Sequence, residues 1–126
     1  GLPADARLYD ASAPTVRLAT RDPADALQTL LARDHHHVLL EGGPTLAGAF
    51  LATGLVDRVV AYVAPLLIGD GPAAVTGAGV TTISGAHRLA VDSVTQVGPD
   101  LRVVARVVRE PAAAAANPTT TTNEEP

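Results

Sequence analysis

Two helix starts, each marked by a proline, separate three short apolar runs in this sequence. Asp22-Pro23 places an acceptor side chain before a proline suited to the first helical position. Gly43-Pro44 is a second such start, and apolar residues at helical spacing follow both. The runs at 15–19, 38–40 and 59–64 are typical of strands, the last two of buried ones. The order strand, helix, strand, helix, strand predicts an α/β fold with parallel neighbouring strands.

The C-terminal third predicts a hairpin. The segments 89–97 and 101–108 are strand-like, and the turn residues Gly98-Pro99-Asp100 join them. In the second segment Arg102 and Arg106 alternate with apolar residues, so one face is expected to be exposed to water. This antiparallel pair makes the predicted sheet mixed. Residues 111–126 are of low complexity and cannot bury enough apolar surface to become ordered. We therefore expect one domain over 1–110 and a disordered tail over 111–126.

Composition excludes several classes of function. The net charge of −4 favours neither nucleic acid nor an anionic membrane surface as a partner. There is no cysteine for a disulfide, a thiolate nucleophile or a zinc–thiolate site, and all nine basic residues are arginine, which excludes a Schiff base. No apolar run reaches the roughly 20 residues that span a bilayer. We expect a cytoplasmic protein that does not bind a membrane.

The core is expected to be poor in large side chains. Apolar types make up 47% of the 126 residues, but they include only one Phe, two Tyr and no Trp. Aromatic side chains bury the most apolar area, so their scarcity limits the stabilisation that one small domain can gain. Stability is therefore expected to be modest, or to depend on a partner.

The segment Glu41-Gly42-Gly43-Pro44 is the candidate functional site. A predicted buried strand ends in an acid, two glycines follow, and a helix begins. Glycines allow a ligand to approach the backbone, and the N–H groups of a helix start attract phosphate. Gly48 lies inside this helix, which indicates close approach of either a ligand or another backbone. The alternative is an ordinary tight connection, and Pro44 removes one of the N–H groups that a phosphate would use.

Other reactive residue types do not form a convincing site. Three consecutive histidines, 35–37, cannot converge on a metal as two histidines four apart on a helix can, so we expect no metal site. Ser84 has no Gly-x-Ser-x-Gly motif around it, which does not favour a serine hydrolase. Tyr62, on a predicted buried strand, is interpreted as a core residue whose hydroxyl finds a partner.

Four segments in order resemble the reductase domain of the bifunctional riboflavin-biosynthesis deaminase/reductase: 41–50, 54–57, 64–69 and 97–101. The resemblance implies a three-layer, dihydrofolate-reductase-like mixed sheet. It also implies the NADPH-dependent reduction of 5-amino-6-(5-phosphoribosylamino)uracil, a phosphorylated pyrimidine, to its ribitylamino form. Glu41 would contact the substrate. The NADPH site would be lined by Gly43, Pro44, Thr45, Leu46, Ala47, Gly48 and Ala49.

The same resemblance indicates that only the C-terminal half of a reductase domain is present, so we expect an incomplete fold and no closed active site in this chain alone. A homodimer, or a chain that supplies the missing half-domain, is the expected partner. Two alternatives stay open: another dihydrofolate-reductase-like NADPH reductase, and a non-catalytic remnant that serves as an oligomerisation or binding module. Arg17 and Arg21 are the candidates for contact with the cofactor's 2′-phosphate.

Overall fold

The computed structural model describes residues 6, 7 and 12–109 of the chain. They divide into two compact units. The first contains the described residues up to Leu55 together with Ala73–Ala78, and the second contains Val56–Pro72 and the described residues from Gly79 onward. The tail predicted over 111–126 lies outside the described residues.

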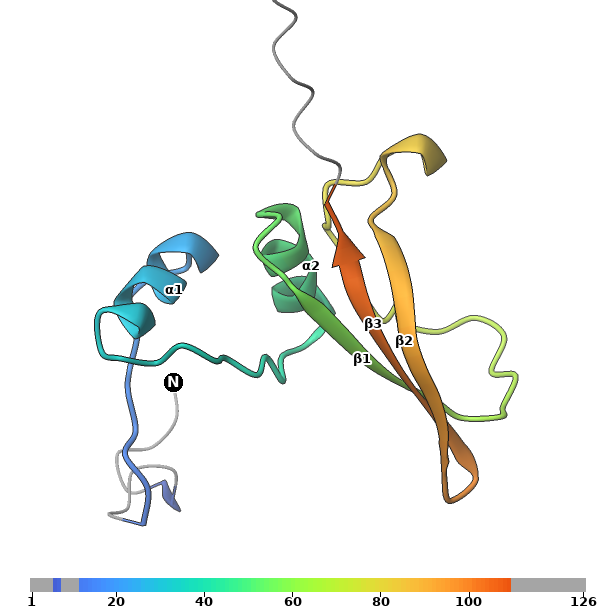
Figure 1. Cartoon of the computed structure of the whole chain (residues 1–126), viewed down its shortest axis with the longest axis horizontal. Helices are drawn as coiled ribbons and strands as arrows, with labels where there is room; N and C mark the ends of the chain where they lie inside the picture. Colours follow the sequence, from blue (N-terminus) through green and yellow to red (C-terminus); the bar gives the residue numbers. More distant parts are fainter. Residues whose placement is uncertain (1–5, 8–11, 110–126) are drawn as a thin grey trace, which may run out of the picture. The chain divides into compact units, whose positions relative to one another are not determined.

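The first unit contains two helices, α1 (Pro23–Leu31) and α2 (Pro44–Ala52), both labelled in Figure 1. Both begin at the predicted prolines. The Asp22 carboxylate accepts a hydrogen bond of 2.8 Å from the Ala24 N–H, as an N-cap residue should. Gly54, with a φ of +69°, follows the Thr53 C-cap of α2, where a left-handed residue commonly ends a helix. The local signals therefore predicted both helices correctly.

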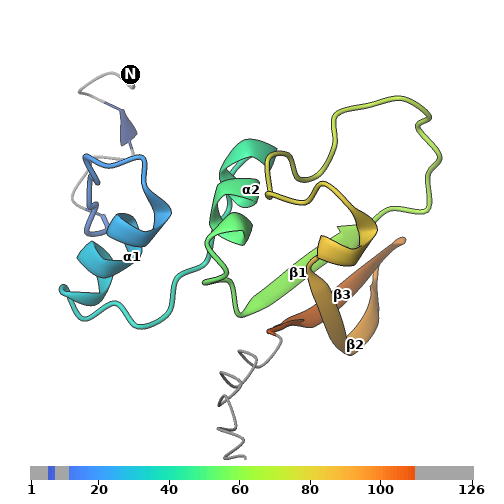
Figure 2. The same ribbon diagram turned by 90° about the horizontal axis from the view of Figure 1, so that it is seen from above.

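The second unit is a three-stranded sheet in the order β1-β3-β2, with β3 in the centre (Figure 1). The strands are β1 (Arg58–Val63), β2 (Arg88–Val97) and β3 (Asp100–Val108), and both pairs are antiparallel. Gly98 has a φ of +59° in the predicted hairpin turn. Figure 2 shows the connection from β1 to the short 3₁₀ helix η2 (Ile83–Gly85) as a long loop.

The predicted strands at 15–19 and 38–40 are not strands among the described residues. Both segments lack helical structure, and neither is a strand of the described sheet, because a strand is defined by a ladder of hydrogen bonds to its neighbour. The predicted parallel pairs are therefore absent from the described part of the chain, where the sheet is purely antiparallel. The α/β class and the C-terminal hairpin are confirmed.

The predicted burial of the strands is wrong. Within the described residues, the buried apolar side chains are those of Val104 and Ala105, both on the central strand β3. Leu39 and Tyr62 are 78% and 62% exposed, so neither is a core residue here. The physical reason is that no layer of described residues covers these segments. Apolar side chains of both units are therefore exposed among the described residues.

Asp57 connects the start of β1 to the end of β3. Its backbone carbonyl accepts a hydrogen bond of 3.0 Å from the Val107 N–H, and its carboxylate accepts one of 2.8 Å from Arg109. Both bonds join residues about fifty positions apart in the chain, so they help to hold the outer strand β1 against β3.

Candidate functional site

The first turn of α2 has no side chain that satisfies its backbone donors. Its N-cap is Gly43, which has no side chain to accept a hydrogen bond, and the turn contains no acidic residue. The Ala47 N–H donates to the Gly43 carbonyl at 3.0 Å, and this first helical bond leaves the N–H groups of Thr45 and Leu46 without a helical acceptor. By contrast, Asp22 caps α1 and Asp25 lies in its first turn. The start of α2 therefore suits an external anion better than the start of α1.

Three glycines near this turn have different physical explanations. A Cβ at Gly42 would lie 2.6 Å from Cδ2 of Leu46, so the Leu46 side chain occupies that space. A Cβ at Gly43 would meet no described atom within 4 Å, and its φ of −72° is open to any residue. Neither packing nor backbone strain requires a glycine at position 43. Its bare backbone leaves room for a ligand beside the open N–H groups.

Gly48 is explained by protein backbone. It is the buried residue of α2, and a Cβ there would overlap the carbonyl oxygen of Thr76. The sequence predicted that either a ligand or another backbone segment lies close to Gly48. In the described residues it is another backbone segment. The assignment of Gly48 to the NADPH site remains a prediction.

Thr76 is a residue that sequence reasoning missed. Its N–H donates to the Pro44 carbonyl at 3.1 Å, and its hydroxyl lies 3.4 Å from the hydroxyl of Thr45. Gly48 signalled that some segment approaches the helix, but nothing in the sequence pattern showed which one. The segment Ala73–Ala78 lies in the same compact unit as α2.

The remaining predicted site residues have graded exposure along the turn. Glu41, Gly43, Pro44, Thr45 and Leu46 are exposed, whereas Ala47 and Ala49 are half-buried. The structure therefore brings together the predicted acid, the helix start and the exposed Thr45 hydroxyl on accessible chain. Glu41 lies two residues before the N-cap and is exposed.

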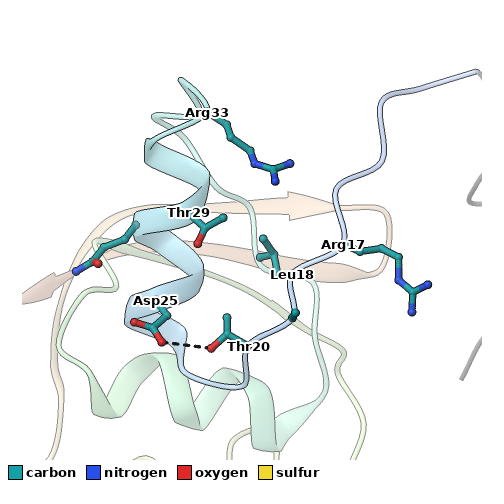
Figure 3. A pocket seen from close by; sticks show the side chains of 8 residues that line it. Arg17, Leu18, Thr20, Asp25, Thr29 and Arg33 are labelled. Carbon is teal, nitrogen blue, oxygen red and sulfur yellow. Dashed lines mark hydrogen bonds between the residues drawn. The ribbon is translucent and has the colours of Figure 1, made fainter.

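A shallow hollow of about 440 Å³ lies between residues 17–20 and α1 (Figure 3). Arg17 and Arg33 both line it, and Asp25 at its lower end accepts a hydrogen bond of 3.5 Å from the Thr20 hydroxyl. Arg21, the other candidate for the 2′-phosphate, is not among the lining residues. Nothing in the sequence favoured either arginine, whereas in the structure Arg17 lines the hollow and Arg21 does not.

The other polar groups give no reactive arrangement in the part of the chain that the structure describes. His36 lies 2.8 Å from the Asp34 carboxylate, and no group of three His, Cys, Asp or Glu that could hold a metal is found over 6–7 and 12–109. The Asp92 carboxylate accepts a hydrogen bond from Arg106, and this bond together with the nearby negative charge raises the pKa of the Arg106 guanidinium above its usual value. None of the described helices is long and apolar enough to cross a membrane.

The chain is similar in sequence to RibD proteins of riboflavin biosynthesis. The chain is 48% identical over 100 residues to the riboflavin biosynthesis protein RibD of Mycobacterium tuberculosis, a match that covers 79% of this chain and 29% of that protein. It is 40% identical over 65 residues to RibD of Escherichia coli, covering 51% of this chain and 18% of that protein. The chain therefore spans less than a third of the length of these relatives.

Solved structures show the same relationship. A form of Acinetobacter baumannii RibD matches with a TM-score of 0.65 and 33% identity, covering 72% of this chain and 26% of that one. A second form matches with the same TM-score and 32% identity. The fold is thus the dihydrofolate-reductase-like fold of RibD. The family model of the RibD C-terminal domain matches residues 2–103, and the chain belongs to this family.

Proposed function

We propose that this chain contributes the cofactor-binding turn and a substrate contact to an NADPH-dependent reductase of riboflavin biosynthesis. The reaction would reduce 5-amino-6-(5-phosphoribosylamino)uracil to its ribitylamino product. Membership of the RibD C-terminal family supports the pathway. The observation that carries the cofactor proposal is the first turn of α2, where open N–H groups adjoin a glycine that the described residues do not explain.

Each part of the turn has a task in this proposal. The N–H groups of Thr45 and Leu46 would donate to the cofactor's diphosphate, and the positive end of the helix dipole would add to that attraction. Gly43 leaves space for the diphosphate to come close. Glu41 would accept hydrogen bonds from the pyrimidine substrate. When bound, NADPH supplies the hydride that reduces C1 of the opened sugar.

The proposal extends to partners and location. The exposed apolar side chains of β1 and β2, among them Val63 and Val91 at 50% and 60% exposure, favour a second copy or a chain that supplies further layers of the domain. The reductase would act in the cytoplasm. Another NADPH reductase of the same fold differs from this proposal in its substrate, and both candidate substrates should be assayed once the partner is present.

The direct test is an NADPH titration of the 126-residue chain by calorimetry, with NADH and inorganic phosphate as controls. Saturable binding supports the proposal. The Gly43→Asp variant sharpens the test because its carboxylate would cap the N–H groups and repel the diphosphate. The Gly43→Asn variant is the neutral control of nearly equal shape.

We expect Gly43→Asp to keep or slightly raise stability, since Gly and Asp differ as N-caps by only a few tenths of a kcal/mol. It should lose NADPH binding, whereas Gly43→Asn should keep more of it. Equal NADPH affinity of Gly43→Asp and the unmodified chain would show that the turn does not bind the cofactor.

A non-catalytic binding module is the second candidate, and the same exposed apolar strands favour it. It predicts a folded chain, by circular dichroism, that gives no heat with NADPH and elutes as an oligomer in size-exclusion chromatography. A monomer that binds NADPH would eliminate this candidate.

A further inference from the structure

The segment Ala73–Ala78, here called the strap, contacts α2 mainly through Thr76, and the backbone nitrogen of Ala78 also lies near Gly48. The Thr76 N–H donates to the carbonyl of Pro44 at 3.1 Å. Its hydroxyl lies 3.4 Å from that of Thr45. Its carbonyl lies against the Cα of Gly48, where an added Cβ would come within 2.7 Å of the carbonyl carbon. One residue of a long loop thus engages three positions of the helix.

Two of these positions form the start of the helix. Pro44 and Thr45 are the first and second helical residues, and no side chain caps the N–H groups of this turn. The first turn of a helix frays readily because its donors lack partners. An outside residue that holds the Pro44 carbonyl and packs closely one turn further along, at Gly48, restricts how this turn moves.

The backbone on the C-terminal side of the contact favours glycine. Gly77 and Gly79 have φ values of +71° and +76°, in the left-handed region. They flank Ala78 and turn the chain after Thr76, so the Thr76 carbonyl can lie on the helix. The backbone of the strap from Thr76 to Ala78 therefore approaches Gly48, and the Thr76 carbonyl makes the shortest contact.

We propose that Thr76 is a positioning residue of the cofactor site: it holds the first turn of α2 in the geometry that binds the diphosphate. The inference rests on the proposed function, because it concerns the same turn. Thr76 acts through Pro44, Thr45 and Gly48. It therefore affects cofactor affinity without being required to touch the cofactor.

Reciprocity supplies the first test. If the strap favours the binding geometry, bound cofactor must stabilise the strap by the same factor. Hydrogen exchange of the Thr76 N–H, followed by nuclear magnetic resonance on the 126-residue chain, should slow by about fivefold or more when NADPH saturates it, at the lower end of common coupling factors. Unchanged exchange with NADPH bound would overturn the inference.

The second test displaces the strap. Gly48→Ala should weaken NADPH binding by about fivefold or more, the same lower limit. Gly71→Ala is the matched control in the same loop, because its added Cβ would meet only Cγ2 of Ile68, at 3.9 Å. We expect Gly71→Ala to bind as the unmodified chain does. A folded Gly48→Ala variant with unchanged affinity would overturn the inference.

A milder pair of variants decides the matter if Gly48→Ala does not fold. Thr76→Val removes the hydroxyl and keeps the volume, while Thr76→Ser restores the hydroxyl. We expect weaker NADPH binding in the first and recovery in the second, and equal affinity of both would overturn the inference. If the unmodified chain does not bind NADPH, both the proposed function and this inference are overturned. If the chain binds NADPH and all strap variants bind it with the same affinity, only the inference is overturned.

Discussion

The carbonyl of Thr76 lies against the Cα atom of Gly48, although 28 positions separate the two residues in the printed sequence. A Cβ at position 48 would overlap the carbonyl oxygen, so only glycine permits this approach. Glycine inside a helix costs about 1 kcal/mol relative to alanine, and here the close contact offsets that cost.

Gly48→Ala is therefore expected to destabilise the chain despite the better helix propensity of alanine. The added methyl group must displace either the strap or the helix, and overpacking of this kind typically costs about 1–3 kcal/mol. Urea denaturation followed by circular dichroism measures the free energy of unfolding. Gly71→Ala, in open surroundings, should be neutral or slightly stabilising. A Gly48→Ala variant as stable as Gly71→Ala would contradict the contact.

Asp22→Ala should destabilise α1. The Asp22 carboxylate accepts the Ala24 N–H at 2.8 Å, and loss of such a cap typically costs about 0.5–2 kcal/mol. Asp22→Asn should retain most of the stability because its amide oxygen can accept the same bond. The comparison requires thermal melts of both variants under one buffer. If the alanine and asparagine variants have the same melting temperature, the cap does not contribute to the stability of the chain.

Arg17 and Arg21 are expected to differ in their effect on cofactor choice if the hollow beside α1 binds the 2′-phosphate. Arg17 lines this hollow and Arg21 does not. In that case Arg17→Gln should lower the ratio of NADPH to NADH affinity by about tenfold or more, since a charged hydrogen bond contributes about 1.5–3 kcal/mol. Arg21→Gln should leave the ratio unchanged. The opposite order, measured by calorimetry, would place the 2′-phosphate away from the hollow.

Asp92→Asn should lower stability slightly and without pH dependence near neutrality. Asp92 is the extra residue at a register shift between Val91 and Ser93, and it accepts a 2.8 Å bond from Arg106. The bond raises the pKa of Arg106 in the folded state. Its contribution to folding stability is therefore complete below the pKa of Arg106 in the unfolded chain, and it is lost only as the pH rises through the pKa of Arg106 in the folded chain. That window lies far above neutrality.

The measurement for this pair is the melting temperature of the unmodified chain and of Asp92→Asn at pH 6 and pH 9. The decrease should be equal at both values and should shrink at high salt, because exposed pairs are screened. A decrease confined to one pH would mean that Arg106 titrates in that range, contrary to its raised pKa.

The sequence by itself determined the local elements of this protein. Asp22-Pro23, Gly43-Pro44 and Gly98-Pro99-Asp100 act within a few residues through caps, fixed proline angles and a tight turn, so both helices and the hairpin could be predicted from them. The open helix start at Gly43 follows from the same local chemistry.

Only the tertiary structure decided the contacts between distant segments. It paired β1 with β3, kept 15–19 and 38–40 out of the described sheet, exposed Leu39 and Tyr62, and identified Thr76 as a neighbour of Gly48. Such outcomes depend on which segments of the chain are brought together. An apolar run or a helical glycine can be recognised in the sequence, but it does not specify which segment will lie beside it. The hydrophobic effect is non-directional, so any segment of suitable shape can provide the contact.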